Sequence, residues 1–595
     1  MDDPSHHAQS RKGDRVNIFL DDLNLEGYSL EPVAVALYSN GFKVIGRSKK
    51  LYRPRGFYSL EPEDRLLLTR IGDEYLNPCE VYCRDGQKIE LSLSTPFLVK
   101  FFSPFLNGYF QHRRLLRNRF LWRLAVDKIR QFANHPDIRT VKTVKAVKTI
   151  QLESDVVIIG GGLAGLTAAY TVSQLGLRTL LIDKSLQLGG RLRYDYLDVP
   201  GISMPREQLL ENIISRISLL KNLSILTKTV FAGFFEDYPI AYSQEERSLY
   251  ILKAKAYIIA TGQIDIPCVF RNNDLPGIFS GSTVLEMVNM YGVKPGERGL
   301  VIGFNQNSLR VAEQLKQLGI NVALVDYSEP EKIQYSLSSI GECFGNVEEI
   351  EALGKTCVKN VKIVHDGRRD ELKADFIVCS AFPSPDVRIL NQLNSKMVFI
   401  DGVGFVPVHD EYMRLKDNIF IAGGASGTPY SILHMKEGEI SALSAAYMLG
   451  VKEAESATDE KIREYKEKLR EMNVGWKSVV FEFSRGKPIG DHVSNRPPTL
   501  FIEKPRKDAF ICFCEDITAE DVSRTVYEKG YVLLELVKRS LGVCTGRCQG
   551  RLCMVNTALY VSYLSKLDPN RVGLSRARAP TTPIPLYAFI GGGDE

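Results

Sequence analysis

A pattern of strand, glycine-rich turn, helix and second strand occurs twice, and it constrains the fold more than any other feature. The first copy, residues 155–185, reads DVVIIGGGLAGLTAAYTVSQLGLRTLLIDKS, and the second, residues 299–328, reads GLVIGFNQNSLRVAEQLKQLGINVALVDYS. The key positions of the second copy follow those of the first by 143 residues. A strand that leads through a helix into a parallel strand is the building unit of a parallel α/β sheet. The pattern therefore predicts an α/β protein with two Rossmann-like, doubly wound domains.

Each marked position in the first copy has a physical role. Gly160 permits the tight turn, Gly162 lets the backbone approach a pyrophosphate, and Gly165 allows the helix to pack closely on the strand. The N-terminus of the helix then faces the phosphates. Asp183, at the end of the second strand, is placed to accept hydrogen bonds from a ribose. We expect this copy to bind an adenine dinucleotide.

The second copy departs from this pattern. Gly303 and Asp326 are retained, and nothing basic directly follows Asp326, which favours NAD over NADP if either binds. Asn305 and Ser308 replace the second and third glycines. Serine is small enough for the packing, whereas the asparagine amide would crowd the phosphates. We expect a degenerate NAD-like domain that is either a weak nucleotide site or a fold kept for structure.

Three further segments extend the first nucleotide fold. AYIIATG (256–262) predicts a returning strand, LKDNIFIAGGASG (415–427) a last strand beside the diphosphate, and GGRL (189–192) a glycine pair after the acid. The additional residues expected to bind the cofactor are Lys184, Gly190, Arg191, Thr261, Gly262, Gly423 and Gly424. The set resembles the two-dinucleotide-domain flavoproteins of the glutathione reductase class, which implies FAD. That class usually has an acid at the position of Gly424, so another adenine dinucleotide stays an alternative.

Many reductases of that class carry a redox disulfide over the flavin. The middle of this chain has only widely spaced cysteines, which are Cys268, Cys343, Cys357 and Cys379. Disulfide reduction is therefore not expected. His434 and Glu437 lie one turn apart on a predicted helix, and we interpret them as core or interface residues rather than as an acid–base pair. No catalytic residue is assigned.

Composition excludes several classes of protein. A chain of 595 residues exceeds the roughly 250–300 residues of a single core, so several domains are expected. The formal net charge of +5 is too dilute for a nucleic-acid-binding face. The longest apolar run falls short of the about 20 residues that span a bilayer, and the first residues are polar. An odd number of cysteines, eleven, favours a reducing compartment, so we expect a cytoplasmic protein.

Two cysteine motifs stand near the end of the chain. Cys512 and Cys514 form C-x-C, and Cys548 and Cys553 form C-x4-C. Four thiolates on two short loops suit a 2Fe-2S cluster, and they also suit zinc. Cys544 is a fifth cysteine, which we interpret as a bystander. The sequence therefore predicts a metal centre that holds either a 2Fe-2S cluster or zinc.

Several segments resemble one family. The cysteine motifs resemble the ferredoxin domain of bacterioferritin-associated ferredoxin, and this resemblance favours a 2Fe-2S cluster over zinc. GFKVIGRSKKLYRPRGFYSLEPED (41–64) is similar to a signature of the alpha subunit of heterotetrameric sarcosine oxidase, and the order of parts to about residue 450 is the same. That longer subunit ends in a folate-binding domain, and we expect no such domain here. The cysteine-rich end and RARAPTTPIPL (576–586) resemble the alpha subunits of proline and hydroxyproline dehydrogenases, opine oxidases and hydrogen cyanide synthase.

The resemblance implies a function. In that family an amine is oxidised at a flavin in a beta subunit of the D-amino-acid-oxidase-like class, FMN lies near a subunit boundary, and the alpha subunit carries a dinucleotide or ATP. We therefore expect the electron-transferring alpha subunit of a heteromeric amino- or imino-acid dehydrogenase or oxidase, with further small subunits possible. The alternatives are an autonomous NAD(P)H-dependent flavin oxidoreductase and a non-catalytic scaffold subunit.

The expected domain organisation follows from these motifs. Cys79 and Cys83 do not have the C-x4-C-x2-C spacing of a plant-type ferredoxin, so the N-terminal domain is expected to lack a cluster. The arginine-rich segment 112–132 is expected to be a helix, packed on the protein itself or binding a partner or membrane surface. The predicted parts are a tail (1–14), a β-grasp ferredoxin-like domain (15–100), a helical linker (101–150), the first nucleotide domain (151–280 and 381–450), the second (281–380), a linker (451–505), a small helical 2Fe-2S domain (506–565) and a tail (566–595).

Overall fold

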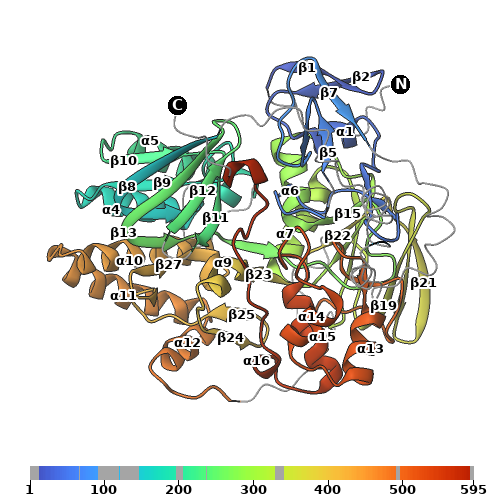
Figure 1. The fold of residues 1–595 in the computed structure, drawn as a ribbon. Coiled ribbons are helices and arrows are strands. Elements are labelled where there is room, and N and C mark those ends of the chain that lie inside the picture. The colour runs from blue at the N-terminus through green and yellow to red at the C-terminus, as the bar shows by residue number, and fades with distance from the viewer. Residues whose placement is uncertain are drawn as a thin grey trace. The chain divides into compact units, whose positions relative to one another are not determined.

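The computed structural model describes residues 13–65, 68–91, 120, 147–195, 205–235, 238–328, 341–490 and 496–589 (Figure 1). The chain forms two compact units, each built from three separate segments. The first unit comprises residues 1–143, 265–382 and 493–575, and the second comprises 144–264, 383–492 and 576–595. Most of the predicted linker 101–150, including all but one residue of the arginine-rich helix, lies outside the described residues.

The second unit is built on the sheet of the first nucleotide domain. Its parallel part has the order β10-β9-β8-β13-β27, and an antiparallel pair continues it beyond β13. Val156 and Ile158 pack on one face of the sheet and Val157 and Ile159 on the other, as a strand covered on both faces requires. The strands are β8 (Lys148–Ile159), β9 (Thr179–Ile182), β10 (Leu223–Leu226), β11 (Thr229–Phe235), β12 (Tyr238–Ser243), β13 (Ser248–Ile259), β26 (Arg414–Lys416) and β27 (Ile419–Ile421).

Helices cover this sheet and extend beyond it. α4 packs on α10, which in turn packs on α11. The segment expected to be a linker after residue 450 instead begins with two helices, because Ala454, Thr458, Ile462, Tyr465 and Leu469 recur at helical spacing and are buried. The remaining elements of the unit are α4 (Leu163–Gln174), α5 (Arg206–Ser218), α9 (Val387–Gln392), β24 (Met397–Ile400), β25 (Gly404–Pro407), α10 (Ser431–Met448), α11 (Glu453–Glu471) and α12 (Trp476–Ser484).

The first unit contains the second nucleotide domain. Its five-stranded parallel sheet has the order β15-β22-β16-β17-β18, with a separate three-stranded antiparallel sheet. The elements are β15 (Ile278–Ser280), α6 (Gly281–Met290), β16 (Arg298–Ile302), α7 (Gln306–Gln317), β17 (Asn321–Val325), β18 (Cys343–Phe344), β19 (Val347–Leu353), β20 (Asn360–His365), β21 (Arg368–Lys373) and β22 (Phe376–Cys379). Both predicted strand–turn–helix–strand copies are thus present.

The N-terminal domain of the first unit is a five-stranded sheet of order β2-β1-β7-β5-β6 beside one helix. β1 pairs antiparallel with β2 and parallel with β7. Residues 33–38 of the helix are all buried, as is the side chain of Cys83. The elements are β1 (Arg15–Leu20), β2 (Leu23–Tyr28), α1 (Val33–Ser39), β3 (Gly46–Arg47), β4 (Pro54–Arg55), β5 (Thr69–Ile71), β6 (Glu74–Leu76) and β7 (Gln87–Glu90).

The cysteine-rich domain is a short hairpin followed by helices. The hydroxyl of Thr518 and the carboxylate of Asp521 form a capping box that starts α13, and Gly530 (φ +66°) ends it. The elements are β28 (Phe510–Cys512), β29 (Ile517–Thr518), α13 (Ala519–Lys529), α14 (Leu534–Leu541), α15 (Met554–Ser565) and α16 (Pro569–Val572). Among the described residues, no helix combines the length and the hydropathy that crossing a bilayer requires.

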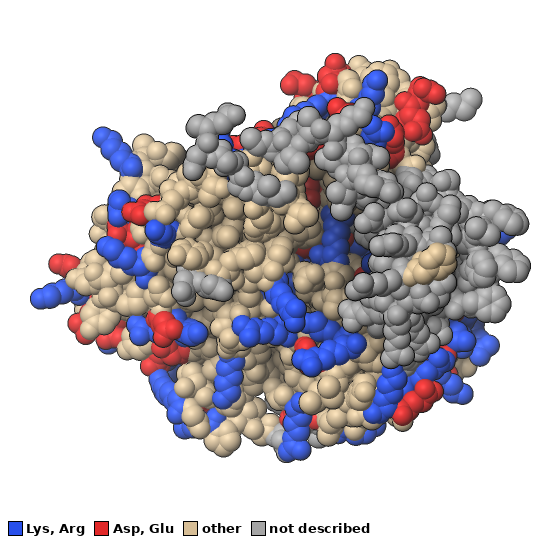
Figure 2. All heavy atoms as spheres, in the orientation of Figure 1, with Lys and Arg blue, Asp and Glu red and all other residues tan. Residues whose placement is uncertain are grey.

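The described surface carries charges of both signs. On the face drawn in Figure 2, Lys and Arg side chains are mixed with Asp and Glu side chains around the edges. This mixture agrees with the small net charge of the whole chain.

Candidate functional site

The first glycine turn has the geometry that a dinucleotide-binding fold requires. The chain turns at Gly160 (φ +109°), where a β-carbon would lie 2.3 Å from the carbonyl oxygen of Ala260. A β-carbon on Gly165 would lie 1.8 Å from the carbonyl oxygen of Gly160, so α4 packs directly on the turn. Gly162 precedes α4, and no described side chain caps the helix. The first N–H groups of α4 can therefore serve an anionic ligand.

Asp183 braces the same turn. Its Oδ2 accepts a hydrogen bond of 2.6 Å from the N–H of Gly161, and its Oδ1 accepts one of 2.7 Å from the N–H of Ser185. Gly190 has φ +52°, and a β-carbon there would lie 3.0 Å from Cα of Gly162. The acid and the glycine pair thus hold the turn in shape, and a ribose contact of Asp183 stays a prediction.

The strand β13 brings another predicted group to this turn. Thr261 follows β13, and its hydroxyl oxygen is buried with no hydrogen-bond partner among the described residues. Because burying a hydroxyl without a partner is unfavourable, this atom suits a bound polar group. Gly262 has φ +77°, Lys184 is exposed, and Arg191 is half-buried. The donor set therefore fits an adenine dinucleotide.

The glycines of the last predicted segment, Gly423 and Gly424, are closely surrounded. These surroundings explain why position 424 carries no acid. A β-carbon on Gly423 would lie 2.7 Å from Cβ of Ala164. A β-carbon on Gly424 would lie 3.0 Å from Cγ of Gln263, whose amide donates to the carbonyl of Gly427. The side chain of Gln263 thus occupies the space that an acid at position 424 would enter.

Glu437 holds this glycine segment through hydrogen bonds. Its carboxylate is fully buried in α10 and accepts hydrogen bonds from the N–H of Gly423 and from three hydroxyls, and it forms an ion pair of 3.1 Å with Lys477. The hydroxyls are those of Ser426, Thr428 and Tyr465. His434 contacts the carbonyl oxygen of Thr428 at 2.7 Å. Both residues are therefore core supports of residues 423–428, which agrees with the interpretation from sequence.

The charge on Glu437 predicts an acid limit for the stability of the protein. Burial alone raises the pKa of Glu437, but Lys477 and the hydroxyl donors outweigh it and lower the pKa to about 2. Because the folded-state pKa lies below the ordinary value of 4.5, this carboxylate stabilises the fold fully above about pH 4.5. We expect its contribution to disappear as the pH falls from 4.5 towards 2. Denaturant titrations across this range should show a steeper loss of stability for the wild type than for Glu437→Gln.

In the second nucleotide fold, the side chain of Asn305 occupies the N–H groups at the start of α7. Gly303 keeps the turn (φ +124°), but Oδ1 of Asn305 accepts hydrogen bonds from the N–H groups of Asn307 and Ser308. Its amide donates to the carbonyl oxygens of Ser380 and Ala381 at 2.6 and 3.0 Å. The N–H groups that would bind a pyrophosphate are therefore already used. This capping adds a second reason for the degeneracy predicted from sequence.

Asp326 has a similar internal role. Its Oδ2 accepts a hydrogen bond of 3.0 Å from the N–H of Phe304, and its Oδ1 accepts two from Ser328. Burial raises the pKa of Asp326, and the main-chain and hydroxyl donors oppose this shift. Asp326 thus closes the turn, as Asp183 does in the first fold.

Removing the cap should open the second fold. We expect the variant Asn305→Gly/Ser308→Gly to bind NADH measurably more tightly than the wild type, because the N–H groups at the start of α7 become free for a phosphate. Fluorescence titration with NADH measures the change. Ser328→Gly, which leaves the cap intact, is the control, and equal NADH affinity in all three proteins would contradict this explanation.

The four predicted cysteine ligands lie together in the first unit. Cys512 ends β28, Cys514 follows it, and Cys548 and Cys553 lie on the loop before α15. Hydrogen bonds from the thiols of Cys514 and Cys553 lower the pKa of Cys548 well below its usual value. The thiol of Cys553 also contacts that of Cys512. Two motifs that are separated in sequence thus form one continuous group of sulfurs.

The loops that carry these thiols are closely packed. A β-carbon on Gly546 would lie 2.3 Å from Cβ of Cys514, so only glycine lets the two loops approach. In the described part of the chain, no three His, Cys, Asp or Glu side chains are arranged to hold a single metal ion. In a 2Fe-2S cluster each iron takes two protein ligands rather than three or four. The thiol of Cys514 interacts with that of Cys548, and the thiol of Cys553 interacts with those of Cys512, Cys544 and Cys548. Two pairs of thiols can be drawn from this group, so the donor set fits this cluster.

A fifth sulfur lies beside them, and sequence reasoning missed it. Cys544 is 4% exposed, and its Sγ lies 3.8 Å from Sγ of Cys553. The structure therefore places this residue, which the sequence led us to interpret as a bystander, against one of the predicted ligands. Its C-x3-C spacing from Cys548 was the available signal, but spacing alone does not show which sulfurs face each other.

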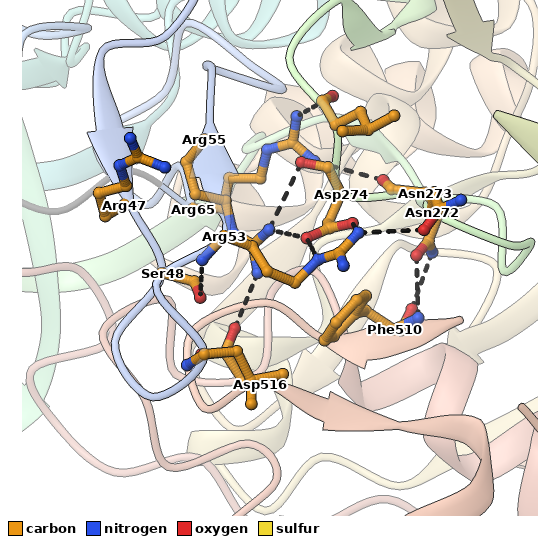
Figure 3. Close-up of polar contacts among 12 residues, drawn as sticks. Arg47, Ser48, Arg53, Arg55, Arg65, Asn272, Asn273, Asp274, Phe510 and Asp516 are labelled. Carbon is orange, nitrogen blue, oxygen red and sulfur yellow. Dashed lines mark hydrogen bonds and ion pairs between the residues drawn. The ribbon is translucent and has the colours of Figure 1, made fainter. Parts of the chain in front are cut away.

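A buried ionic network holds the first ligand segment (Figure 3). Arg55 is 1% exposed and forms ion pairs with Asp274 and with Asp516, the latter at 2.7 Å. Arg53 donates two hydrogen bonds to Asp274, at 2.6 and 2.8 Å. Burial opposes ionisation, but Arg55 and Arg53 outweigh it and lower the pKa of Asp274. Since Asp516 follows Cys514 by two residues, the network ties the C-x-C motif to the arginines of the signature segment.

Further hydrogen bonds hold the strand that leads into this motif. The amide of Asn273 donates to the carbonyl of Phe510, and the N–H of Phe510 donates back to the Asn273 oxygen, both at 2.8 Å. The guanidinium groups of Arg53 and Arg55 lie 5.2 and 5.4 Å from the centre of the Phe510 ring. The other side of Asp516 accepts the N–H groups of residues 50 and 51. The ligand strand is thus fixed at both ends.

Family profiles match three parts of the chain. Residues 13–92 match a 2Fe-2S iron-sulfur cluster binding domain, residues 154–450 a pyridine nucleotide-disulphide oxidoreductase domain, and residues 506–593 the sarcosine oxidase A3 domain. The first match supports the predicted ferredoxin-like fold. That segment contains two cysteines, Cys79 and Cys83, so by itself it cannot supply four thiolates.

Curated proteins and a solved structure are similar over most of the chain. The alpha subunit of sarcosine oxidase from Rhizobium meliloti (strain 1021) is 23% identical, over 95% of this chain and 57% of that protein. The opine oxidase A-type subunit of Rhizobium meliloti is 22% identical, over 75% of this chain and 89% of that protein. The crystal structure of L-proline dehydrogenase from P. horikoshii has a TM-score of 0.72 and 24% identity, and covers 99% of this chain and 100% of that one.

The similarity covers nearly all of this chain but only part of the sarcosine oxidase relative. The chain spans 57% of the length of the sarcosine oxidase relative. The solved structure shows that the fold is shared over essentially the whole chain. In this chain the matches to the ferredoxin-like, oxidoreductase and A3 profiles follow one another between residue 13 and residue 593. The chain is therefore similar, over most of its length, to the sarcosine oxidase alpha and opine oxidase A-type subunits.

Proposed function

We propose that the chain is the electron-transferring, alpha-type subunit of a heteromeric amino- or imino-acid dehydrogenase or oxidase. The observation that carries this proposal is the convergence of four thiols in a chain that also has a complete dinucleotide turn. The relatives are named for sarcosine, opines and proline. The substrate is an amine or imino acid of this kind, held by the partner subunit.

The cofactors follow from the two fitted sites. The N–H groups at the start of α4, the hydroxyl of Thr261 and the turn at Gly423 would hold FAD, another adenine dinucleotide or ATP. Cys512, Cys514, Cys548 and Cys553 would hold a 2Fe-2S cluster. A bound cluster of this type accepts and releases single electrons, so beside a flavin it divides a two-electron oxidation into one-electron steps. FMN would lie at a subunit boundary, and the capped second fold makes NAD the least supported group.

The residues of this chain would hold the cofactor-binding segments in position. The network of Arg55, Asp274 and Asp516 holds the C-x-C strand, and Glu437 with Lys477 holds the glycine segment of the nucleotide fold. The partner would be a beta subunit of the D-amino-acid-oxidase-like flavoprotein class, with further small subunits, in the cytoplasm.

Cofactor analysis of the purified complex tests the proposal. We expect iron and acid-labile sulfide in a 1:1 ratio, about two of each per chain, together with an adenine nucleotide. Cys548→Ala should lose the iron, whereas Cys343→Ala, outside the thiol group, should keep it. A wild-type complex that contains zinc and neither iron nor flavin would refute the proposal.

The two alternative functions predict different experimental results. An autonomous NAD(P)H-dependent flavin oxidoreductase requires the second fold to bind nicotinamide, and the cap formed by Asn305 opposes this. NADH bleaching of a flavin in the isolated chain would favour it nevertheless. A non-catalytic scaffold would contain a cluster that substrate never reduces, which electron paramagnetic resonance of the substrate-treated complex would reveal.

A further inference from the structure

We propose that Cys544 is a fifth ligand position of the thiol group, able to replace Cys512 as the partner of Cys553 on the same iron. The inference rests on the proposed 2Fe-2S cluster and goes beyond the four cysteines that the motifs indicate. It concerns which sulfurs can hold one of the two irons together with Cys553. Cys514 and Cys548, whose thiols interact, would hold the other iron.

The separation of the two sulfurs carries the inference. Sγ of Cys544 and Sγ of Cys553 are 3.8 Å apart. A tetrahedral metal with metal–thiolate bonds of about 2.3 Å places its sulfurs about 3.8 Å from each other. Each iron of a 2Fe-2S cluster takes one pair of protein ligands. Cys544 and Cys553 therefore already have the spacing of such a pair.

The loop keeps Cys544 in this position. Cys544 has φ +63°, a left-handed conformation that is uncommon for a residue with a side chain. A β-carbon on Gly550 would lie 3.3 Å from Cβ of Cys544, so the loop folds back tightly over it. With Cys544 only 4% exposed, its thiol faces protein and the neighbouring sulfur rather than solvent.

The exchange of ligands is balanced without any oxidant. In a bound cluster, the bond between iron and the sulfur of Cys512 would break, and a bond between iron and the sulfur of Cys544 would form. The proton of the Cys544 thiol moves to the Cys512 thiolate, and no electron is transferred. After the exchange, three of the four ligands come from the loop 543–553 and only Cys514 comes from the other motif.

Alanine variants of the full chain, purified as the complex, separate the alternatives. We expect Cys544→Ala to keep the wild-type iron content. Cys512→Ala should also keep at least half of the iron, but with altered visible absorption and a shifted electron paramagnetic resonance spectrum of the reduced cluster. Cys512→Ala/Cys544→Ala should lose the iron. Cys514→Ala should lose it as well, because Cys544 is paired with Cys553 and not with Cys548.

Two results would overturn the inference. One is a folded Cys512→Ala protein, by circular dichroism, that contains no iron. The other is a double variant with as much iron as the single Cys512→Ala variant. If Cys512→Ala does not fold, the same comparison uses Cys512→Ser and Cys512→Ser/Cys544→Ala. Iron that is absent from the wild type refutes the proposed function, whereas iron lost only on changing Cys512 refutes this inference alone.

Discussion

Arg55→Met is expected to lower the free energy of unfolding by about 3–5 kcal/mol, the usual cost of breaking a buried ion pair by removing one partner. Asp274 and Asp516 would stay buried, at 0% and 2% exposure, without the guanidinium that lies between them. Because Asp516 follows Cys514 by two residues, the loss of iron should accompany the loss of stability. Denaturant unfolding with parallel iron analysis measures both effects.

A surface arginine gives the matched control. Arg70 pairs with Glu90 at 3.1 Å, but both side chains are about half exposed. Pairs of this kind contribute about 0–1 kcal/mol, so Arg70→Met should change stability little. Adding Asp516→Asn to Arg55→Met should recover part of the loss, because one unpaired charge is removed. Equal destabilisation by Arg55→Met and Arg70→Met would show that the buried network does not hold the ligand strand.

Lys477→Met is expected to have a similar effect in the second unit, again about 3–5 kcal/mol. Lys477 and Glu437 are both 0% exposed, and the ammonium also donates to Ser426 and Thr428. Removing the ammonium leaves the Glu437 carboxylate buried beneath the glycine segment at Gly423. The pKa of Glu437 should rise, and the adenine nucleotide should dissociate more readily. Thermal unfolding and nucleotide release are the measurements.

The control for this prediction is a surface pair on α11. Lys468 lies 2.6 Å from Glu471, and both side chains are partly exposed, so Lys468→Met should be nearly neutral. Glu437→Gln/Lys477→Met removes both charges and should be more stable than Lys477→Met alone. A double variant that is no more stable than the single one would contradict the assignment of the loss to an unpaired carboxylate.

Local motifs allowed much of the nucleotide folds to be predicted. Gly160 and Gly165 are required by contacts within one strand–turn–helix unit and the adjacent strand, so their spacing alone revealed the fold. The replacement of glycine by Asn305 was visible in the same way, and so was the crowding of the phosphates that its amide would cause. Its capping of α7 depends on side-chain orientation and on the carbonyls of residues 380 and 381, which spacing does not show.

Contacts between residues far apart in the sequence could not be predicted from local motifs. Arg55 was seen only as part of a signature, because its partners Asp274 and Asp516 are 219 and 461 residues away. The use of Gln263 to fill the space beside Gly424 was equally invisible. The helices after residue 450 were interpreted as a linker because their few apolar residues become meaningful only when α10 is there to cover them.

The amino-acid sequence by itself determined the two nucleotide folds, the two thiol motifs and the order of the parts, because each depends on residues that are close along the chain. Tertiary structure alone decided which charges are buried together and which sulfurs touch. Ion pairs such as Arg55 with Asp516, and contacts such as Cys544 with Cys553, form only when packing brings side chains from different segments or loop turns within a few ångströms.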